Sequence, residues 1–165
     1  MSPANTTGAL DRAFRLLSSR PHSEKEIRVK LATRGYPQEE IEKAVARLME
    51  LRYINDEELC PQHAQSRVTK ANVGPARLRL ELARKGFAEI LIEKTVDELY
   101  PQAQNELATA FRAAAKKIRT LKPGMDAQAA RKKIFDHLLR KGFDMETARK
   151  VALDEFDTLM QGGQS

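Results

Sequence analysis

The chain has 165 residues, of which 41% are hydrophobic and 32% charged, and its net charge at pH 7 is +6. This apolar fraction is typical of a folded protein and excludes general disorder, while the few glycines (8) and prolines (7) argue against a turn-rich β-sandwich or barrel. No apolar run reaches the roughly eighteen residues of a membrane span, and the N-terminus lacks a secretory signal pattern. The single cysteine, Cys60, cannot form an internal disulfide, so we expect a cytoplasmic protein.

Glycines and prolines divide the sequence into segments with helical periodicity, since glycine ends helices and proline fits their first turn. The predicted helices span residues 8–19, 24–34, 37–51, 56–69, 75–85, 88–99, 102–121, 127–141 and 145–160. Several starts carry side chains that can accept a free backbone N–H. These are Ser23 with Glu26 and Asn55 with Glu58 at capping-box spacing, and Asp126 and Asp144 as single N-caps.

Pro61 lies about five residues inside the fourth predicted helix. Proline lacks the N–H that bonds back one turn, so the helix either kinks there or begins there. We favour a new start near Pro61, with residues 55–60 forming a short separate turn.

An internal repeat is the strongest signal in the sequence. Ile27–Tyr36, Leu78–Phe87 and Ile134–Phe143 each read aliphatic, three residues, Leu, two residues, basic, Gly, aromatic. The glycines Gly35 and Gly86 are separated by 51 residues, and Gly86 and Gly142 by 56. The aliphatic residue and the leucine share one helix face, the basic residue complements the helix C-terminus, and the aromatic residue beyond the glycine can pack back on the helix.

The repeat predicts a core and a fold. The expected core residues are Leu31, Leu82, Leu138, Tyr36, Phe87 and Phe143. The following helix has a matched apolar face, with Ile41, Val45 and Leu48 against Ile92, Val96 and Leu99; the third copy has Ala148, Ala152 and Glu155, where we expect Phe156 to take over the packing. The fold class is therefore all-α, a tandem array of three three-helix repeats spanning residues 1–53, 54–100 and 101–165, which stack because one such unit buries little surface alone.

No catalytic or metal-binding constellation is present. The histidines His22, His63 and His137 fall in different predicted repeats without metal-ligand spacing. Cys60 and His63 are three residues apart, but an ordinary buried thiol is the favoured interpretation of Cys60. We therefore expect a binding or regulatory protein, not an enzyme, with no cofactor and no metal.

The excess positive charge is concentrated in the middle and the end of the chain. Residues 112–133 hold eight basic residues against Asp126, and residues 67–85 hold six against Glu81, whereas residues 39–58 hold seven acids and three bases. A single lysine here is best interpreted as part of a solvated helix face. The clusters as a whole favour a phosphate or acidic-protein contact, and without interleaved aromatics any nucleic-acid binding would be sequence-independent.

These motifs resemble the RecX family, bacterial regulators of the RecA recombinase. The resemblance extends from about Ala9 to Leu159 and is carried by Leu16–Ile27 with Leu31 and Gly35–Tyr36, by Tyr53–Glu57, by Gly74–Leu82 through Lys85–Gly86, and by Arg140–Phe143. The stretch Leu59–Pro61 departs from the family, which usually has an aromatic residue and alanine after the acidic pair. We therefore expect the packing of the first repeat on the second, and with it the curvature, to differ from that of the family.

The resemblance implies an elongated, curved monomer that binds along the groove of the RecA–DNA filament. It also implies a negative regulator that restrains filament growth, ATP hydrolysis, strand exchange and co-protease activity. We expect the basic face of the second and third repeats to contact the filament or DNA phosphate. The expected contacts are Arg67, Lys70, Arg77, Arg79, Arg84, Lys85, Lys116, Lys117, Arg119, Lys132 and Lys133.

Two other functions stay open. A sequence-independent helical DNA-binding protein would suit the net charge, because short helices after glycine turns resemble helix-turn-helix geometry. A helical adaptor for some other acidic protein is the third possibility.

Overall fold

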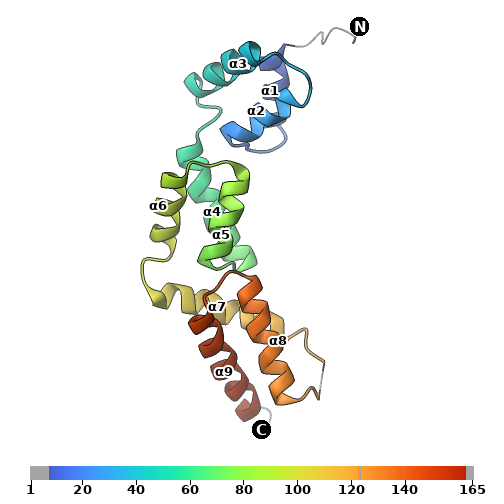
Figure 1. The fold of residues 1–165 in the computed structure, drawn as a ribbon, viewed down its shortest axis with the longest axis vertical. Helices are drawn as coiled ribbons and strands as arrows, with labels where there is room; N and C mark the ends of the chain where they lie inside the picture. The colour runs from blue at the N-terminus through green and yellow to red at the C-terminus, as the bar shows by residue number, and fades with distance from the viewer. Residues whose placement is uncertain (1–7, 123, 163–165) are drawn as a thin grey trace. The chain divides into compact units, whose positions relative to one another are not determined.

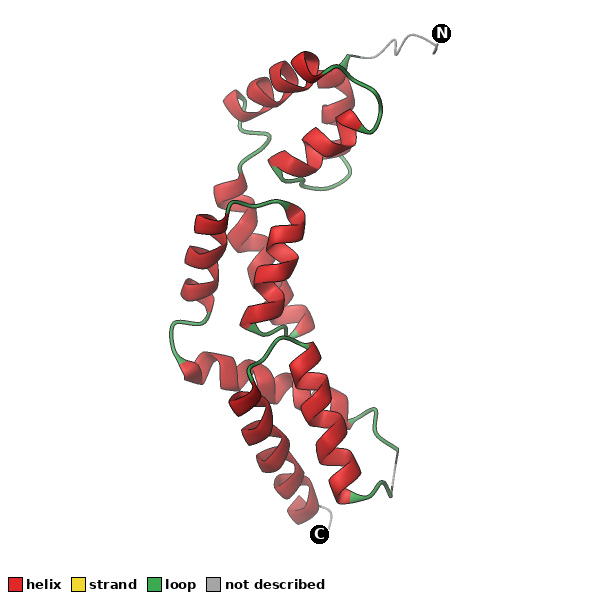
Figure 2. Ribbon diagram, viewed as in Figure 1, coloured by secondary structure: helices red, strands yellow, loops and turns green. Residues whose placement is uncertain are grey.

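The computed structural model describes residues 8–122 and 124–162, with side chains as far as residue 154 (Figure 1). Within these residues the chain consists of helices and loops without strands, as Figure 2 shows. The helices are α1 (Ala9–Leu17), α2 (Glu24–Ala32), α3 (Gln38–Glu50), α4 (Asp56–Ala71), α5 (Pro75–Lys85), α6 (Glu89–Leu99), α7 (Ala103–Ile118), α8 (Ala127–Arg140) and α9 (Met145–Gly162). All of these bounds lie within three residues of the predicted ones, which confirms the all-α prediction.

The predicted N-caps are confirmed by their hydrogen bonds. Ser23 and Glu26 form a capping box, in which the Glu26 N–H donates to Ser23 Oγ at 3.2 Å and the Ser23 N–H donates to the Glu26 carboxylate at 3.1 Å. The other three caps accept a backbone N–H three residues ahead: Asn55 from Glu58 at 3.3 Å, Asp126 from Ala129 at 3.0 Å and Asp144 from Thr147 at 2.7 Å. The chemistry of the helix starts could therefore be predicted from local spacing alone.

The predicted restart at Pro61 is wrong, because α4 runs through it from Asp56 to Ala71. The N–H that Pro61 lacks would have bonded to the Glu57 carbonyl. Glu57 is exposed, so water can bond to that carbonyl in place of the protein. The cap of Asn55 and three acidic residues in the first turn fix the start of the helix before Pro61, so the helix forms with one backbone hydrogen bond fewer.

The glycine-aromatic pattern ends α2, α5 and α8 in the same way. Gly35, Gly86 and Gly142 have φ angles of +82°, +87° and +86°, which a residue with a side chain rarely adopts. The N–H of the following aromatic residue donates to the leucine carbonyl five residues earlier, at 3.4, 3.4 and 3.2 Å in Tyr36, Phe87 and Phe143. All six predicted core residues of the motif are buried: Leu31, Leu82, Leu138, Tyr36, Phe87 and Phe143.

The contacts divide the chain into two compact parts. The first part contains the residues up to Gln62 together with Leu82–Ile92, and the second contains His63–Glu81 together with the residues from Glu93 onward. The core of the first part lies among α1, α2 and α3, and the core of the second among α7, α8 and α9. In the second part α8 and α9 lie side by side in opposite directions (Figure 1).

Most residues of the apolar face expected on the third helix of each repeat are buried. Ile41, Val45, Leu48, Ile92 and Val96 are buried, and Leu99 is half-buried. In α9, Ala148 and Ala152 are buried as expected, but fully buried Val151 supplies the larger side chain. In the glycine register Val151 corresponds to Ala44 and Thr95, which are also buried. The three positions compared along the sequence did not include this one. The expected packing of Phe156 lies outside the side chains that the structure describes.

Two expectations about the array stay predictions. They are the boundaries 1–53, 54–100 and 101–165, and the elongated, curved arrangement of the repeats. The first and last ranges include residues 1–7, 123 and 163–165, which lie outside the described residues, as does the N-terminal stretch on which the absence of a signal was predicted.

Backbone contacts join the second and third repeats within the second part. The Gly74 N–H donates to the Lys141 carbonyl at 2.7 Å, and the Ala76 N–H donates to the Gly142 carbonyl at 3.2 Å. A Cβ at Gly74 would lie 2.6 Å from the backbone of Gly142. We call these contacts between the second and third repeats the second joint, and they require glycine on both sides.

Alanine substitutions can distinguish the destabilising effect of a steric clash at the second joint from that of the positive φ angle. Gly142→Ala would place a methyl group on the backbone N and Cβ of Arg77, whereas a Cβ at Gly35 meets nothing within 4 Å. We expect Gly35→Ala to lower the free energy of unfolding by about 1–2 kcal/mol through its positive φ alone. Gly142→Ala carries the same strain plus overpacking, so we expect about 3–4 kcal/mol. Urea denaturation followed by circular dichroism measures both losses of unfolding free energy. Equal losses would contradict the close backbone approach at the second joint.

Candidate functional site

The eleven basic residues expected to contact the filament fall into two groups. Five make an ion pair or a hydrogen bond inside the protein: Arg67, Arg77, Arg79, Lys85 and Lys116. The other six make no side-chain ion pair within the described residues: Lys70, Arg84, Lys117, Arg119, Lys132 and Lys133. The sequence alone does not give this division, because four of the five partners lie on other helices.

Glu81 holds two of the internally bound arginines. Arg67 Nε and a terminal nitrogen donate to its carboxylate at 2.6 and 3.0 Å, and Arg77 Nε donates at 2.9 Å. These hydrogen bonds, that from Arg67 first, lower the pKa of Glu81 against the opposing effect of its burial. Arg77 also donates to the Arg140 carbonyl at 2.9 Å. Both arginines therefore have structural roles at the second joint.

The other internally bound residues also stabilise helices or joints. Arg79 on α5 donates to the Glu93 carboxylate on α6 at 2.8 and 3.0 Å. Lys116 donates to the Lys70 carbonyl at 3.2 Å, near the end of α4, where the helix dipole favours a positive charge. Arg79 and Lys116 therefore already have partners inside the protein, which they would lose in contacting another molecule.

Several cations converge on the second joint around Lys141 and His137. Lys141 donates to the Ala71 carbonyl at 2.6 Å, and its pKa is lowered by burial and then by the charges of Arg77, Arg67 and Lys116. Burial lowers the pKa of His137 to about 4, and the charges of Lys141, Lys117 and Arg140 act in the same direction. His137 is therefore neutral at pH 7. The sequence analysis did not select Lys141, although it is the basic residue of the third basic-Gly-aromatic motif.

The basic residues without an internal ion pair have the chemistry needed to bind anions. Lys70, Arg119, Lys132 and Lys133 are exposed and Lys117 is half-buried, so they can meet phosphate or carboxylate groups. Their side chains all belong to the second part, whereas Arg84 belongs to the first. Among the described residues there is no group of three or more His, Cys, Asp or Glu able to hold a metal ion. In the same residues no helix has the length and apolar character needed to cross a membrane.

Comparisons with known proteins decide the family. Residues 9–48 match the family model of the first three-helix domain of RecX, and residues 104–152 match that of the third. A regulatory protein RecX of Prosthecochloris aestuarii is 37% identical over 96% of this chain and 99% of its own length. The chain belongs to the RecX family. A second RecX relative, from Chlorobaculum tepidum, is 34% identical over 92% of this chain and 90% of its own length.

Solved structures support the same fold. A crystal structure of RecX from Lactobacillus salivarius matches with a TM-score of 0.73 at 22% identity, covering 91% of this chain and 95% of that one. A second crystal structure of a regulatory protein RecX matches with a TM-score of 0.74, covering 87% of this chain and 70% of that one. These matches confirm the all-α array of three-helix repeats.

Residues of three motifs that carry the RecX resemblance meet in the first part of the chain. Ser23 Oγ donates to the Lys85 carbonyl at 2.5 Å, and the Glu24 N–H donates to Asp56 Oδ1 at 3.0 Å. Glu26 pairs with Arg20 at 2.9 Å and with Lys85 at 3.4 Å. We call these contacts the first joint. The motif residues therefore connect the first repeat to the second, which is a structural role.

The first joint gives the stability of the protein a pH dependence. Burial by itself raises the pKa of Glu26, but hydrogen bonds from Arg20 and the Ser23 N–H, with the charges of Lys85 and Arg20, lower it to about 2. A carboxylate with a lowered pKa stabilises the fold fully above its ordinary value of 4.5, and this contribution is lost as the pH falls toward 2.

We expect wild-type stability to fall more steeply between pH 4.5 and 2 than that of Glu26→Gln, which cannot titrate. Urea midpoints measured across this range test the difference. Glu39→Gln is a matched control, because Glu39 is an exposed glutamate on α3 whose partner is an exposed lysine. Parallel curves for wild type and Glu26→Gln would contradict the assignment.

Proposed function

We propose that this protein is a negative regulator of RecA that binds the RecA–DNA filament and restrains its growth, ATP hydrolysis, strand exchange and co-protease activity. It acts as a monomer in the cytoplasm, by binding and not by catalysis. The observation that carries the proposal is membership of the RecX family across 96% of the chain. The array of three-helix repeats supports it, because repeat proteins present extended surfaces suited to polymeric partners.

The unpaired cations provide the contact surface in this proposal. A filament groove offers DNA phosphate and protein carboxylates together, and both bind Lys and Arg. Lys117 and Arg119 lie at the end of α7, and Lys132 and Lys133 lie near the start of α8. None of these four makes a side-chain ion pair within the described residues, so they are available to a partner without a cost to the fold.

Charge reversal at unpaired sites tests this surface. We expect the double variant Lys117→Glu with Arg119→Glu to need about tenfold more protein for half-inhibition of RecA ATP hydrolysis on single-stranded DNA. The physical reason is the loss of two favourable contacts and the gain of two repulsive ones. Helix content by circular dichroism is expected to stay unchanged, because neither side chain makes an ion pair inside the described residues.

The matched control is Lys94→Glu with Lys150→Glu. Both lysines are exposed in the second part of the chain, and the change in net charge is the same. We expect this control to inhibit as wild type does. Equal inhibition by both double variants would reject the proposed surface, and no inhibition by the wild-type protein would reject the proposed function.

Direct, sequence-independent DNA binding is the second candidate, favoured by the same unpaired cations. It predicts that the protein alone binds duplex DNA and that the logarithm of affinity falls linearly with the logarithm of salt concentration, by about 0.9 for each phosphate contacted. Fluorescence anisotropy with a labelled duplex from 50 to 200 mM salt measures the slope. Strong binding that is equal for unrelated sequences supports this candidate, and weak binding without RecA excludes it.

A further inference from the structure

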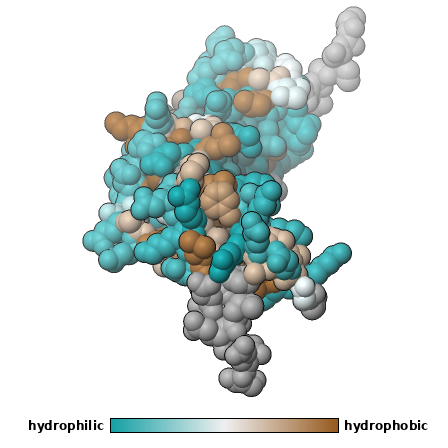
Figure 3. All heavy atoms as spheres, turned by 60° about the horizontal axis from the view of Figure 1, so that its bottom comes forward, coloured by the Kyte–Doolittle hydropathy of each residue, from teal (hydrophilic) through white to brown (hydrophobic). Residues whose placement is uncertain are grey.

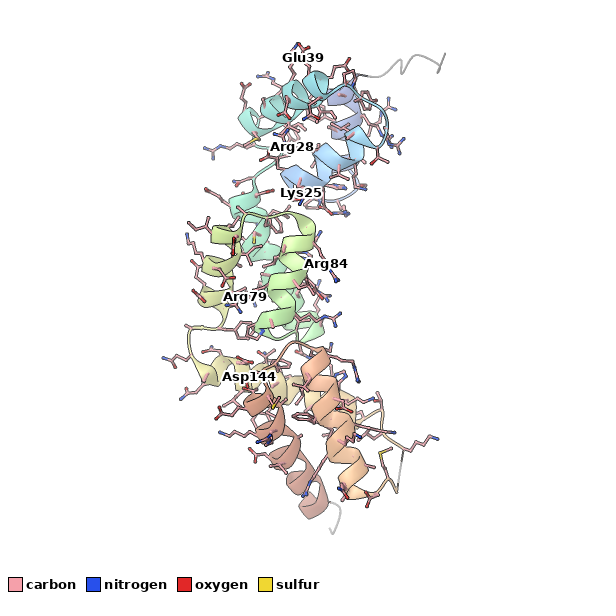
Figure 4. All side chains as sticks on the ribbon, viewed as in Figure 1. Lys25, Arg28, Glu39, Arg79, Arg84 and Asp144 are labelled. Atoms are coloured by element: carbon pink, nitrogen blue, oxygen red, sulfur yellow. The ribbon has the colours of Figure 1, made fainter. Side chains whose placement is uncertain are left out.

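The second and third helices of each repeat pack against each other along a line of contact that we call the seam. In the first two repeats an ion pair crosses this seam. Arg28 on α2 pairs with Glu42 on α3 at 2.5 Å, and Arg79 on α5 pairs with Glu93 on α6 at 2.8 Å. Both pairs join residues 14 positions apart. Figure 4 shows Arg28 between α2 and α3 and Arg79 between α5 and α6. The glycine register makes the two pairs equivalent, so each closes the same seam of its repeat.

The third repeat replaces both members of the pair. In the same register Phe135 on α8 takes the place of the arginine, and Arg149 on α9 takes the place of the glutamate. Arg149 is exposed and makes no ion pair within the described residues. The seam between α8 and α9 thus has a positive charge at the position where the other two repeats have a carboxylate.

Two neighbouring positions open the third seam further. Asp97, whose carboxylate lies 3.9 Å from Arg79 in the second repeat, corresponds to Leu153, which is 44% exposed. Buried Val45 and Val96 correspond to the smaller Ala152. The seam that an ion pair crosses in the first two repeats is therefore an apolar groove in the third. Its lining residues are Gln128, Arg131, Lys132, Phe135, Arg149, Ala152 and Leu153.

The groove differs from the surrounding surface in combining an apolar floor with a basic rim. Figure 3, which brings this end of the second part toward the viewer, shows a largely hydrophilic face with small, scattered apolar areas. Phe135 and Leu153 form the apolar part of the groove, and exposed Lys132 and Arg149 form part of its rim. The helix positions that would supply an internal carboxylate hold Arg149 and Leu153.

We propose that the groove between α8 and α9 binds an acidic peptide segment that carries one large apolar side chain. Its carboxylates would pair with Arg149 and Lys132, and its apolar side chain would cover Phe135 and Leu153. A guanidinium binds a carboxylate through two parallel hydrogen bonds, and an apolar anchor supplies the remaining affinity. The inference rests on the proposed function only in taking the segment to belong to a protein partner.

Charge and polarity together favour a peptide over a nucleic acid in this groove. A phosphate backbone would satisfy the rim but would leave the apolar floor exposed to water. A purely apolar segment would cover the floor and leave Arg149 without a counter-charge. Only an occupant with both kinds of group restores what the ion pair provides in the first two repeats.

The test uses the full chain and a short synthetic fluorescent peptide of aspartate and glutamate residues around one phenylalanine, without RecA or DNA. We expect saturable binding by fluorescence anisotropy, and about tenfold weaker binding when the phenylalanine of the peptide is replaced by serine. We also expect about tenfold weaker binding to Arg149→Glu. The matched control Lys150→Glu, one residue along α9, has the same charge change outside the groove lining and is expected to bind within about twofold of wild type.

A rebuilt ion pair gives an independent check. Phe135→Arg with Arg149→Glu restores the residue types of the first two repeats, so it should close the seam, keep helix content and abolish peptide binding. No binding by the wild-type chain up to about 1 mM peptide, equal binding of the two peptides, or undiminished binding by the rebuilt variant would each overturn the groove. RecA inhibition by the wild-type chain is measured in parallel, so that the two proposals can fail separately. If the wild-type chain binds the peptide but does not inhibit RecA, only the proposed function is rejected.

Discussion

The carbonyl groups at the ends of α5 and α8 need hydrogen-bond donors, and the preceding repeat supplies them. The Lys85 carbonyl accepts from Ser23 Oγ at 2.5 Å, and the Lys141 carbonyl accepts from the Gly74 N–H at 2.7 Å. Ser23 and Gly74 both immediately precede the second helix of their repeat. One contact between a helix end and a helix start therefore joins successive repeats, and the glycine turn that frees the carbonyl is a condition for it.

The two joints use this contact with different additional chemistry. The first joint adds ion pairs among Arg20, Glu26 and Lys85, so its strength depends on pH. The second joint adds a further backbone hydrogen bond and the close approach of two glycines. Because Arg67, Arg77, Lys116 and Lys141 are held around it, the second joint also gathers positive charge. Residues with structural roles therefore lie within the basic surface that we propose for partner binding.

The repeats have also diverged at an equivalent seam. The first two repeats close it with an arginine and a glutamate, and the third places Phe135 and Arg149 there. A solvent-exposed ion pair contributes little stability, so its loss costs the fold little and leaves the position available for another role. Divergence at such a position, with the glycine turns kept, is an economical way for a repeat protein to acquire a partner site.

Helix positions, N-caps, the glycine turns and the buried motif residues could all be predicted from the amino-acid order, because each depends on contacts within about one helical turn. Two local predictions failed: Pro61 lies within a continuous helix, and the expected apolar positions of α9 did not include the buried Val151. The division of the basic residues into bound and unpaired groups was decided by packing, since Arg67 and Glu81 are 14 residues apart and Lys141 and Ala71 are 70. Charge can be counted along a chain, but whether a charge is already neutralised depends on which helices lie beside it.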